Sequence, residues 1–211
     1  MNISIVDTQI PISNTVRTRI FRALIEPLPR GRMVDLGCGP CLFAKHARDF
    51  GFEVTAVDAR TVRIPSPEEL GSIRFVHADV RDFSLLGFDL IAMLGLVYHF
   101  DLDDQIIMLK RCRETGATTI LDSQIHVPAL AIPQSDPPKE WETRVISREG
   151  YEGLEFPEGD NPMASAGNPI SFWHTENSWL KLFENVGFSS VAAINPIFQS
   201  KYGGRRFYQL T

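Results

Sequence analysis

A chain of 211 residues is long enough to form one domain with a full hydrophobic core and too short for two domains of ordinary size. Hydrophobic residues make up 44% of the sequence and charged residues 22%, a balance that is typical of globular proteins and excludes intrinsic disorder. The formal net charge of −5 disfavours nucleic acid as a partner, because proteins that follow a phosphate backbone usually carry the opposite charge.

Targeting features are missing from the sequence. No apolar run is long enough to span a membrane, and the first residues lack the basic and apolar regions of a signal peptide. Three cysteines, an odd number, do not predict a disulfide framework. We therefore expect a cytoplasmic protein without a membrane partner. The sequence does not specify an oligomeric state.

The predicted elements alternate between helices and short apolar strands. A helix is expected from residue 14 to residue 25, within an N-terminal helical segment that spans residues 1–30. Five strands follow, at residues 33–36, 53–57, 74–78, 88–94 and 118–121. One helix follows the first of these strands, and another, at residues 101–115, precedes the last. This alternation predicts an α/β fold with a parallel, doubly wound sheet.

The stretch from residue 127 to residue 174 breaks this pattern. It holds seven of the fourteen prolines and shows little periodicity, which predicts a long irregular insertion before the last helix. Its aromatic residues either hold the insertion against the domain or form an apolar or sugar-stacking pocket. They are Trp141, Tyr151, Phe156, Phe172 and Trp173.

Regular structure resumes with a helix that Thr175 caps and that ends at Val186. Two strands, at residues 190–194 and 206–210, complete a predicted sheet of seven strands. Because no helix separates these two strands, we expect them to pair antiparallel at one edge of the sheet.

Glycines and carboxylates follow the predicted strands at the edge where open α/β sheets bind their ligands. The glycines let the backbone approach a ligand closely. Asp58, about 20 residues past the glycine turn, can bridge two ribose hydroxyls. Asp79 can accept a hydrogen bond from an exocyclic amine such as that of adenine. The candidate cofactor-binding residues are Asp35, Gly37, Cys38, Gly39, Asp58, Ala59, Asp79, Val80, Leu94 and Gly95.

Four of these segments resemble the class I S-adenosylmethionine-dependent methyltransferases. They are VDLGCGP (34–40), VTAVDAR (54–60), VHADVRDF (76–83) and FDLIAMLGLVYHF (88–100). The resemblance implies a Rossmann-like sheet with an antiparallel last strand, a single methyltransferase domain over residues 1–211, and S-adenosyl-L-methionine as cofactor. The chain departs from the family at Cys41, where a third glycine is usual.

The resemblance also implies where the cofactor lies. Asp35, Gly37 and Gly39 would line its methionine end, Asp58 would hold the ribose, and Asp79 with Val80 would meet the adenine.

Methyl transfer to a hydroxyl group requires a base that removes a proton. His99, at the exit of the fourth strand, is the first candidate, and its alternative role is to shape the pocket. His126 and His174 are the other candidates. Tyr98 is either a pocket wall or a proton relay, and Asp122 either orients a histidine or ends a strand in solvent. The spacing of histidines, cysteines and carboxylates matches no known metal site, so we expect no required metal.

The main hypothesis is O-methylation of a small molecule or a glycan, with residues 127–174 as the acceptor-binding lid. Four alternatives stay open. CGPC (38–41) is also the active-site tetrapeptide of thioredoxins. A glycine turn followed by Asp58 also serves nicotinamide dehydrogenases, although their third glycine would fall at Leu42. The segment LGLVYH (94–99) is similar to enzymes that modify transfer RNA, and the domain could instead be a non-catalytic scaffold that binds a cofactor or partner.

Overall fold

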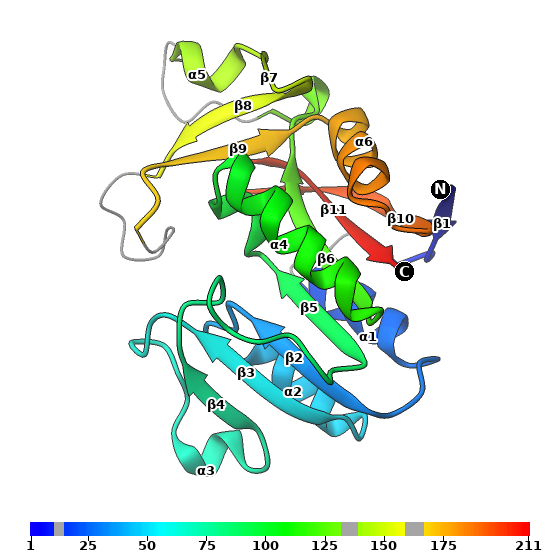
Figure 1. Ribbon diagram of the computed structural model, residues 1–211, viewed down its shortest axis with the longest axis vertical. Coiled ribbons are helices and arrows are strands. Elements are labelled where there is room, and N and C mark those ends of the chain that lie inside the picture. The colour runs from blue at the N-terminus through cyan, green and yellow to red at the C-terminus, as the bar shows by residue number, and fades with distance from the viewer. Residues whose placement is uncertain (11–14, 132–138, 159–166) are drawn as a thin grey trace.

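The computed structural model describes residues 1–10, 15–131, 139–158 and 167–211 (Figure 1). The helices are α1 (Val16–Ile25), α2 (Leu42–Asp49), α3 (Pro67–Leu70), α4 (Leu102–Thr115), α5 (Glu140–Thr143) and α6 (Glu176–Val186), with 3-10 turns η1 (Val97–His99) and η2 (Pro128–Leu130). The strands are β1 (Asn2–Asp7), β2 (Arg32–Leu36), β3 (Glu53–Asp58), β4 (Arg74–His77), β5 (Leu90–Leu94), β6 (Thr118–Ile125), β7 (Ile146–Arg148), β8 (Tyr151–Pro157), β9 (Ile170–His174), β10 (Ser190–Ser200) and β11 (Gly203–Leu210).

Eight strands form the central sheet, in the order β1-β10-β11-β6-β5-β2-β3-β4. All neighbours pair parallel except β11, which is antiparallel to both β10 and β6. The α/β fold with a doubly wound sheet and an antiparallel last strand is therefore confirmed. The chain winds outward from β2 to β4 and then returns to β5 on the other side of β2, so the strand order reverses between β2 and β5. Ligands of such sheets bind beside this reversal.

The sheet has one strand more than the seven predicted. The segment 1–30 contains α1, but Asn2–Asp7 forms the edge strand β1, parallel to β10, with Asn2 opposite Ser190. All six side chains of β1 are exposed, so no buried apolar face marks this strand in the sequence. Its pairing depends on a strand near the other end of the chain. Asn14, the predicted start of the first helix, lies outside the described residues.

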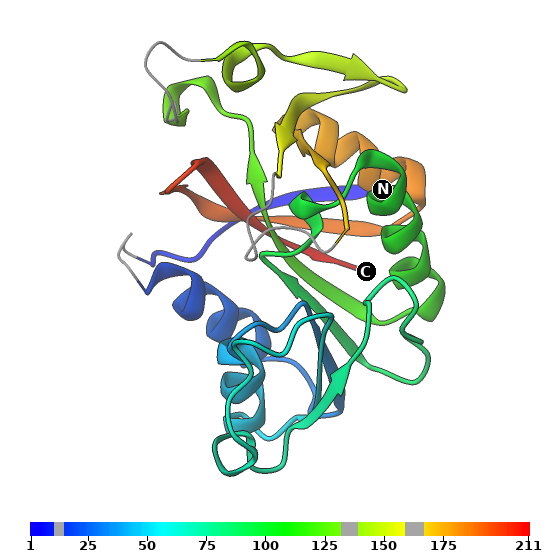
Figure 2. The same cartoon turned by 90° about the vertical axis from the view of Figure 1, so that its left-hand side faces the viewer.

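Helices cover both faces of the sheet. α1 and α2 pack with one set of strand residues, including Met33, Ala92 and Leu94, whereas α4 and α6 pack with the alternate set, including Ile91 and Met93. Figure 2 shows the two pairs of helices on opposite sides of the strands. Because successive side chains of a strand point to opposite faces, each buried strand contributes to both core layers. Among the described residues, no helix has the length and apolarity needed to cross a membrane.

The start of each long helix on the second face is set by a local side-chain cap. The carboxylate of Asp101 accepts a hydrogen bond from the backbone N–H of Asp104 at the start of α4. The hydroxyl of Thr175 does the same for Ser178 at the start of α6. Such caps satisfy N–H groups that have no partner within the helix. The predicted cap at Thr175 is therefore confirmed.

The stretch 127–174 contains more regular structure than the sequence predicts. Strands β7, β8 and β9 form a separate antiparallel sheet. The backbone N–H of Phe172 donates to the carbonyl of Phe100, and that of His126 donates to the carbonyl of His174. This small sheet is thereby attached beyond the carboxyl ends of β5 and β6, as Figures 1 and 2 show. Prolines and glycines interrupt the alternation by which a strand is recognised in a sequence.

Candidate active site

A cavity of about 460 Å³ opens at the carboxyl ends of the parallel strands, beside the reversal of strand order. Its volume is in the range of small-molecule sites. Its wall includes all ten residues predicted to bind the cofactor, which come from the ends of β2, β3 and β5 and from the loop after β4. Residues Asp35 and Gly95, 60 positions apart in the sequence, are thus brought to one site.

The glycine turn after β2 is held against the end of β3. The backbone N–H of Gly37 donates to the carbonyl of Val57 at 2.8 Å, and that of Gly39 donates to Oδ2 of Asp58 at 2.8 Å. Gly37 has a φ of 67°, and a Cβ there would lie 2.7 Å from Cδ1 of Leu96, so a side chain at this position would strain the turn. Asp58 uses one acceptor site on Oδ2 for the turn and one on Oδ1 for the backbone N–H of Arg60, and a carboxylate offers about four. It therefore keeps the capacity to bind ribose hydroxyls.

Asp35 lies at the base of the cavity and is 1% exposed. Its Oδ2 accepts a hydrogen bond from the backbone N–H of Ala44 at 3.2 Å. Burial raises the pKa of Asp35 to about 7, and the nearby charge of Asp58 acts in the same direction, against that hydrogen bond and Arg17. The carboxyl group therefore changes protonation close to neutral pH.

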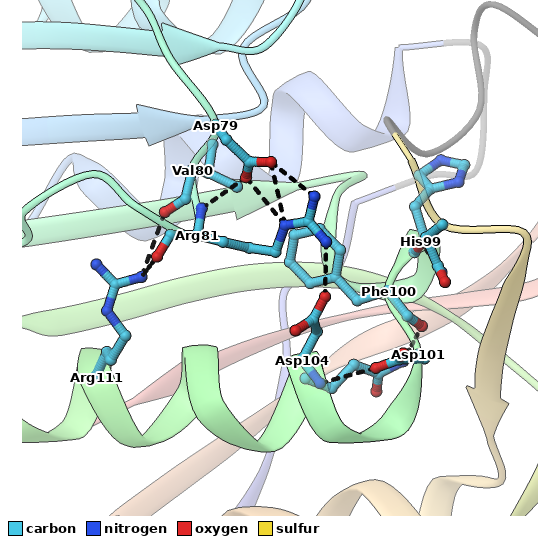
Figure 3. Close-up of polar contacts among 10 residues, drawn as sticks. Asp79, Val80, Arg81, His99, Phe100, Asp101, Asp104 and Arg111 are labelled. Atoms are coloured by element: carbon cyan, nitrogen blue, oxygen red, sulfur yellow. Dashed lines mark hydrogen bonds and ion pairs between the residues drawn. The ribbon is translucent and has the colours of Figure 1, made fainter.

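Asp79 is bound by Arg81 on the cavity wall, as Figure 3 shows. Nη2 of Arg81 lies 2.7 Å from Oδ2 of Asp79, and Nη1 lies 2.9 Å from Oδ2 of Asp104 on α4. The hydrogen bond from Arg81 lowers the pKa of Asp79 and keeps it ionised. The guanidinium of Arg111 holds the same loop by donating to the carbonyls of Val80 and Arg81. Arg81 lies within the segment VHADVRDF (76–83) but was not among the predicted site residues, and it shares the acceptor predicted for an adenine amine.

Asp122 has neither of its predicted roles. It does not orient a histidine or end a strand in solvent, because β6 continues to Ile125 and Asp122 is fully buried. Nε of Arg17 lies 2.6 Å and Nε of Arg205 2.7 Å from its Oδ2. Burial by itself would raise the pKa of Asp122, but the two guanidiniums outweigh it and hold the pKa below its usual value. Both arginines line the cavity. Arg17 belongs to the predicted first helix and Arg205 precedes the predicted last strand, so no signal in the sequence indicated their pairing with Asp122.

His99 lies on the cavity wall and is paired with a buried carboxylate. Its Nδ1 lies 2.9 Å from Oε1 and 3.1 Å from Oε2 of Glu158, which is 5% exposed. The side-chain amide of Asn168 donates to the carbonyl of His99 at 2.8 Å and fixes the backbone there. A carboxylate on Nδ1 places the proton on that nitrogen and leaves Nε2 free to accept another. Glu158 was missed because it lies 59 residues from His99 within the insertion.

The other two predicted histidines do not reach this cavity. His174 is fully buried, with Nδ1 2.8 Å from Oγ of Ser178 and Nε2 2.9 Å from Oε1 of Gln105, and burial lowers its pKa to about 3. Both ring nitrogens are occupied, so His174 supports the packing of α4 and α6 and is not a base. His126 lines a separate cavity of about 30 Å³ with Trp173, and burial lowers its pKa.

Four aromatic rings pack together at the two cavities, with Tyr98 in the wall of the main cavity and Phe156, Trp173 and Tyr202 in the wall of the smaller one. Phe156 stacks on Trp173 with ring centroids 4.2 Å apart, and Tyr98 meets the same indole edge-on at 6.1 Å. The guanidinium of Arg205 lies 5.0 Å from the centroid of Tyr98. Tyr98 is therefore a wall of the main cavity, packed on both sides.

The remaining aromatic residues of the insertion have different positions. Tyr151 and Phe172 belong to the core under α6, where they hold the small sheet against the domain. The side chain of Trp141 lies outside the described residues. Among the residues that the structure describes, no group of three His, Cys, Asp or Glu side chains could hold a metal ion. The expectation that no metal is required stays a prediction.

Comparisons with known proteins concern the domain and the fold. Residues 33–116 match the family model of a methyltransferase domain. No curated protein matches the chain at a significant level. The N-terminal domain of EvdMO1 with SAH bound has a similar fold, with a TM-score of 0.69 at 18% sequence identity over 94% of this chain and 84% of that one.

Two further solved structures share the fold. The glycopeptide N-methyltransferase MtfA, complexed with S-adenosyl-L-methionine, has a TM-score of 0.62 at 14% identity over 98% of this chain and 96% of that one. The 1,6-didemethyltoxoflavin-N1-methyltransferase of Burkholderia thailandensis, with S-adenosylhomocysteine bound, has a TM-score of 0.61 at 15% identity over 94% of this chain and 79% of that one. Residues 33–116 therefore match a methyltransferase domain, and the chain as a whole has the fold of solved methyltransferases that bind S-adenosyl-L-methionine or S-adenosylhomocysteine.

Proposed function

We propose that the protein methylates a hydroxyl group of a small molecule or glycan, with S-adenosyl-L-methionine bound along the ten predicted residues of the main cavity. The observation that carries this proposal is the pair formed by His99 and Glu158 on the wall of that cavity. A neutral amine can attack the methyl group through its lone pair without first losing a proton, whereas a hydroxyl must lose its proton during the transfer.

The residues of the cavity fit the cofactor. The glycine turn leaves open space at Gly39, where a Cβ would meet no atom within 4 Å. Asp58 and Asp79 supply ionisable acceptors at the ends of β3 and β4. The cofactor supplies, when bound, a methyl group already activated by its sulfonium.

The protein then has two tasks, alignment and proton removal. Glu158 accepts a hydrogen bond from Nδ1 of His99 and orients the ring, so that Nε2 can take the hydroxyl proton of the acceptor. The charge of Glu158 also stabilises the imidazolium that results. Tyr98 closes the cavity beside this base.

We propose that residues 127–174 bind the acceptor as a lid. The small sheet β7-β8-β9 stands beyond the strand ends, and Glu158 at the end of β8 reaches back to the cavity wall. The N-terminal domain of EvdMO1 was crystallised in the presence of SAH and D-fucose, which supports a sugar as one class of acceptor to test. The net charge of −5 favours such acceptors over nucleic acid. We keep the expectations of a single domain and of a cytoplasmic location as parts of this proposal.

A screen of hydroxylated metabolites and sugars for release of S-adenosylhomocysteine tests the proposal. We expect His99→Ala to bind S-adenosylhomocysteine as the wild type does and to lose about 10²- to 10⁴-fold in turnover. His126→Ala, which changes a histidine outside the main cavity, is the matched control and should keep its turnover.

Asp58→Ala should lose cofactor affinity in calorimetry, because Asp58 both holds the glycine turn and faces the cavity. Full turnover by the His99→Ala variant would show that His99 is not the base. Unchanged affinity in Asp58→Ala would disprove the cofactor position, and binding without turnover on any acceptor would favour the scaffold alternative.

A further inference from the structure

The two cysteines of the CGPC segment face each other in the turn that borders the cavity. Sγ of Cys38 lies 3.5 Å from Sγ of Cys41, and the backbone N–H of Cys41 donates to the carbonyl of Cys38 at 2.9 Å, which closes the turn. Both thiols are free. A disulfide requires an approach of about 1.5 Å more, which side-chain rotation together with a shift of the turn backbone can supply. Cys112 lies in the core layer on the other face of the sheet, so the only thiol facing either cysteine in the described structure is the other one.

The pair can be reached from the cavity. Cys38 lines the cavity wall and is 5% exposed, whereas Cys41 is fully buried behind it. A small oxidant that enters the cavity therefore meets Cys38 first. A cofactor bound in the same cavity would cover this approach.

The turn that holds the thiols also carries the cavity-facing backbone. Gly37, Cys38 and Gly39 line the cavity, and the N–H of Gly39 is held by Asp58. Cys41 has a φ of 55°, in the left-handed region, directly before α2. Joining the two sulfur atoms would move the backbone on both sides of Gly39, and the contact with Asp58 would change with it.

We propose that Cys38 and Cys41 form a redox modification site, in which hydrogen peroxide converts the two thiols to a disulfide and cofactor binding and oxidation oppose each other. One thiolate attacks a peroxide oxygen, the O–O bond breaks, and the product is a sulfenic acid and one water. The second thiol then displaces the sulfenic hydroxyl, which leaves as the second water as the S–S bond forms. The two cysteines lose two electrons and two protons, and one hydrogen peroxide is reduced to two waters.

This site differs from a thioredoxin activity, because its product is the oxidised methyltransferase and no external disulfide is reduced. The inference rests on the proposed function only in placing the cofactor in this cavity. The hydrogen bond between the two thiols raises the pKa of Cys38, where burial acts in the same direction, and lowers the pKa of Cys41. Cys41 is therefore the thiol that ionises first, and we expect the oxidation to accelerate as the pH rises.

The experiment starts with the affinity of the reduced wild-type protein for S-adenosylhomocysteine. Hydrogen peroxide is then added, and peptide mapping is expected to show Cys38 linked to Cys41. The affinity should fall by about tenfold or more, and dithiothreitol should restore it. Because linkage is reciprocal, saturating S-adenosylhomocysteine should slow disulfide formation.

Two variants separate the site from general damage. Cys41→Gly, which suits the left-handed backbone, should keep its affinity and not respond to peroxide. Cys112→Ala should respond as the wild type does.

If peroxide gives no disulfide between Cys38 and Cys41, or if the linked protein binds S-adenosylhomocysteine as tightly as the reduced protein, the inference is wrong. Absence of binding by the reduced protein would instead disprove the cofactor position. The protection experiment needs only the wild-type chain, so it decides the matter even where a variant does not fold.

Discussion

Asp35 and Asp79 lie on one cavity wall, but their surroundings move their pKa values in opposite directions. Burial raises the pKa of Asp35 to about 7, whereas the hydrogen bond from Arg81 lowers the pKa of Asp79. At neutral pH Asp79 is ionised, while a fraction of Asp35 carries a proton. Environment therefore assigns two chemical states to two identical side chains.

Replacement of Asp35 by Asn tests this difference through stability. Between about pH 4 and pH 7 the unfolded chain has released the Asp35 proton and the folded protein keeps it, so the wild-type free energy of unfolding falls as the pH rises. Asp35→Asn lacks this titration. Its stability relative to the wild type should rise across that window by up to about 4 kcal/mol and level off above pH 7.

Urea unfolding of the cofactor-free protein at a series of pH values measures this effect. Asp79→Asn is the control with the opposite sign. The lowered pKa of Asp79 stabilises the wild type above its unfolded pKa, and this contribution is lost as the pH falls through the folded pKa. A stability difference for Asp35→Asn that does not vary between pH 4 and pH 8 would contradict the role of burial.

At the scale of elements, Asp122 joins three segments that are distant in sequence. It lies on β6, and its two arginines come from α1 and β11. The side chain of Arg205 is 7% exposed and that of Arg17 is 33% exposed. The carboxylate therefore compensates one charge that is almost fully buried and one that water partly solvates.

We expect Asp122→Ala to lower the free energy of unfolding by about 3–5 kcal/mol, because it leaves Arg205 buried without a counter-charge. Arg17→Ala should have a smaller effect, since its side chain is partly exposed and Asp122 keeps Arg205. Chemical denaturation of the two variants measures the comparison. Equal losses in the free energy of unfolding for the two substitutions would show that burial of the arginine does not determine how much each ion pair contributes to stability.

Much of the element pattern could be predicted because its signals are local. The apolar runs of β2, β3 and β5 and the cap at Thr175 are read from a few neighbouring residues. Strand β1 could not be predicted in this way, because its exposed side chains give no apolar pattern and its partner β10 lies near the other terminus. The small sheet was missed for a similar reason, since Pro157 and Gly153 break the alternation within β8.

At the scale of the whole molecule, the cavity links cofactor binding to folding. Its wall draws on the ends of four strands and on both α1 and β11, so it exists only in the folded chain. A ligand that binds only the folded state stabilises it by mass action.

S-adenosylhomocysteine at 100 times its dissociation constant should therefore raise the stability by about 2.7 kcal/mol and the melting temperature by about 5–10 °C. Differential scanning fluorimetry measures the shift. NAD should produce none, which separates the methyltransferase from the dehydrogenase alternative, and Asp58→Ala should lose the response. A shift with NAD that equals the shift with S-adenosylhomocysteine would count against the assignment of the cavity.

The sequence by itself determined the doubly wound sheet, the ten residues at its strand ends and the resemblance to methyltransferases. These follow from runs of apolar residues, from glycines and from carboxylates whose positions along the chain are sufficient to place them at one edge of a parallel sheet. The tertiary structure alone decided which histidine reaches the cavity, gave His99 its partner Glu158, and buried Asp122 between two arginines. Such pairs depend on the packing of segments that the sequence separates, and the desolvation that shifts a pKa exists only after that packing has formed.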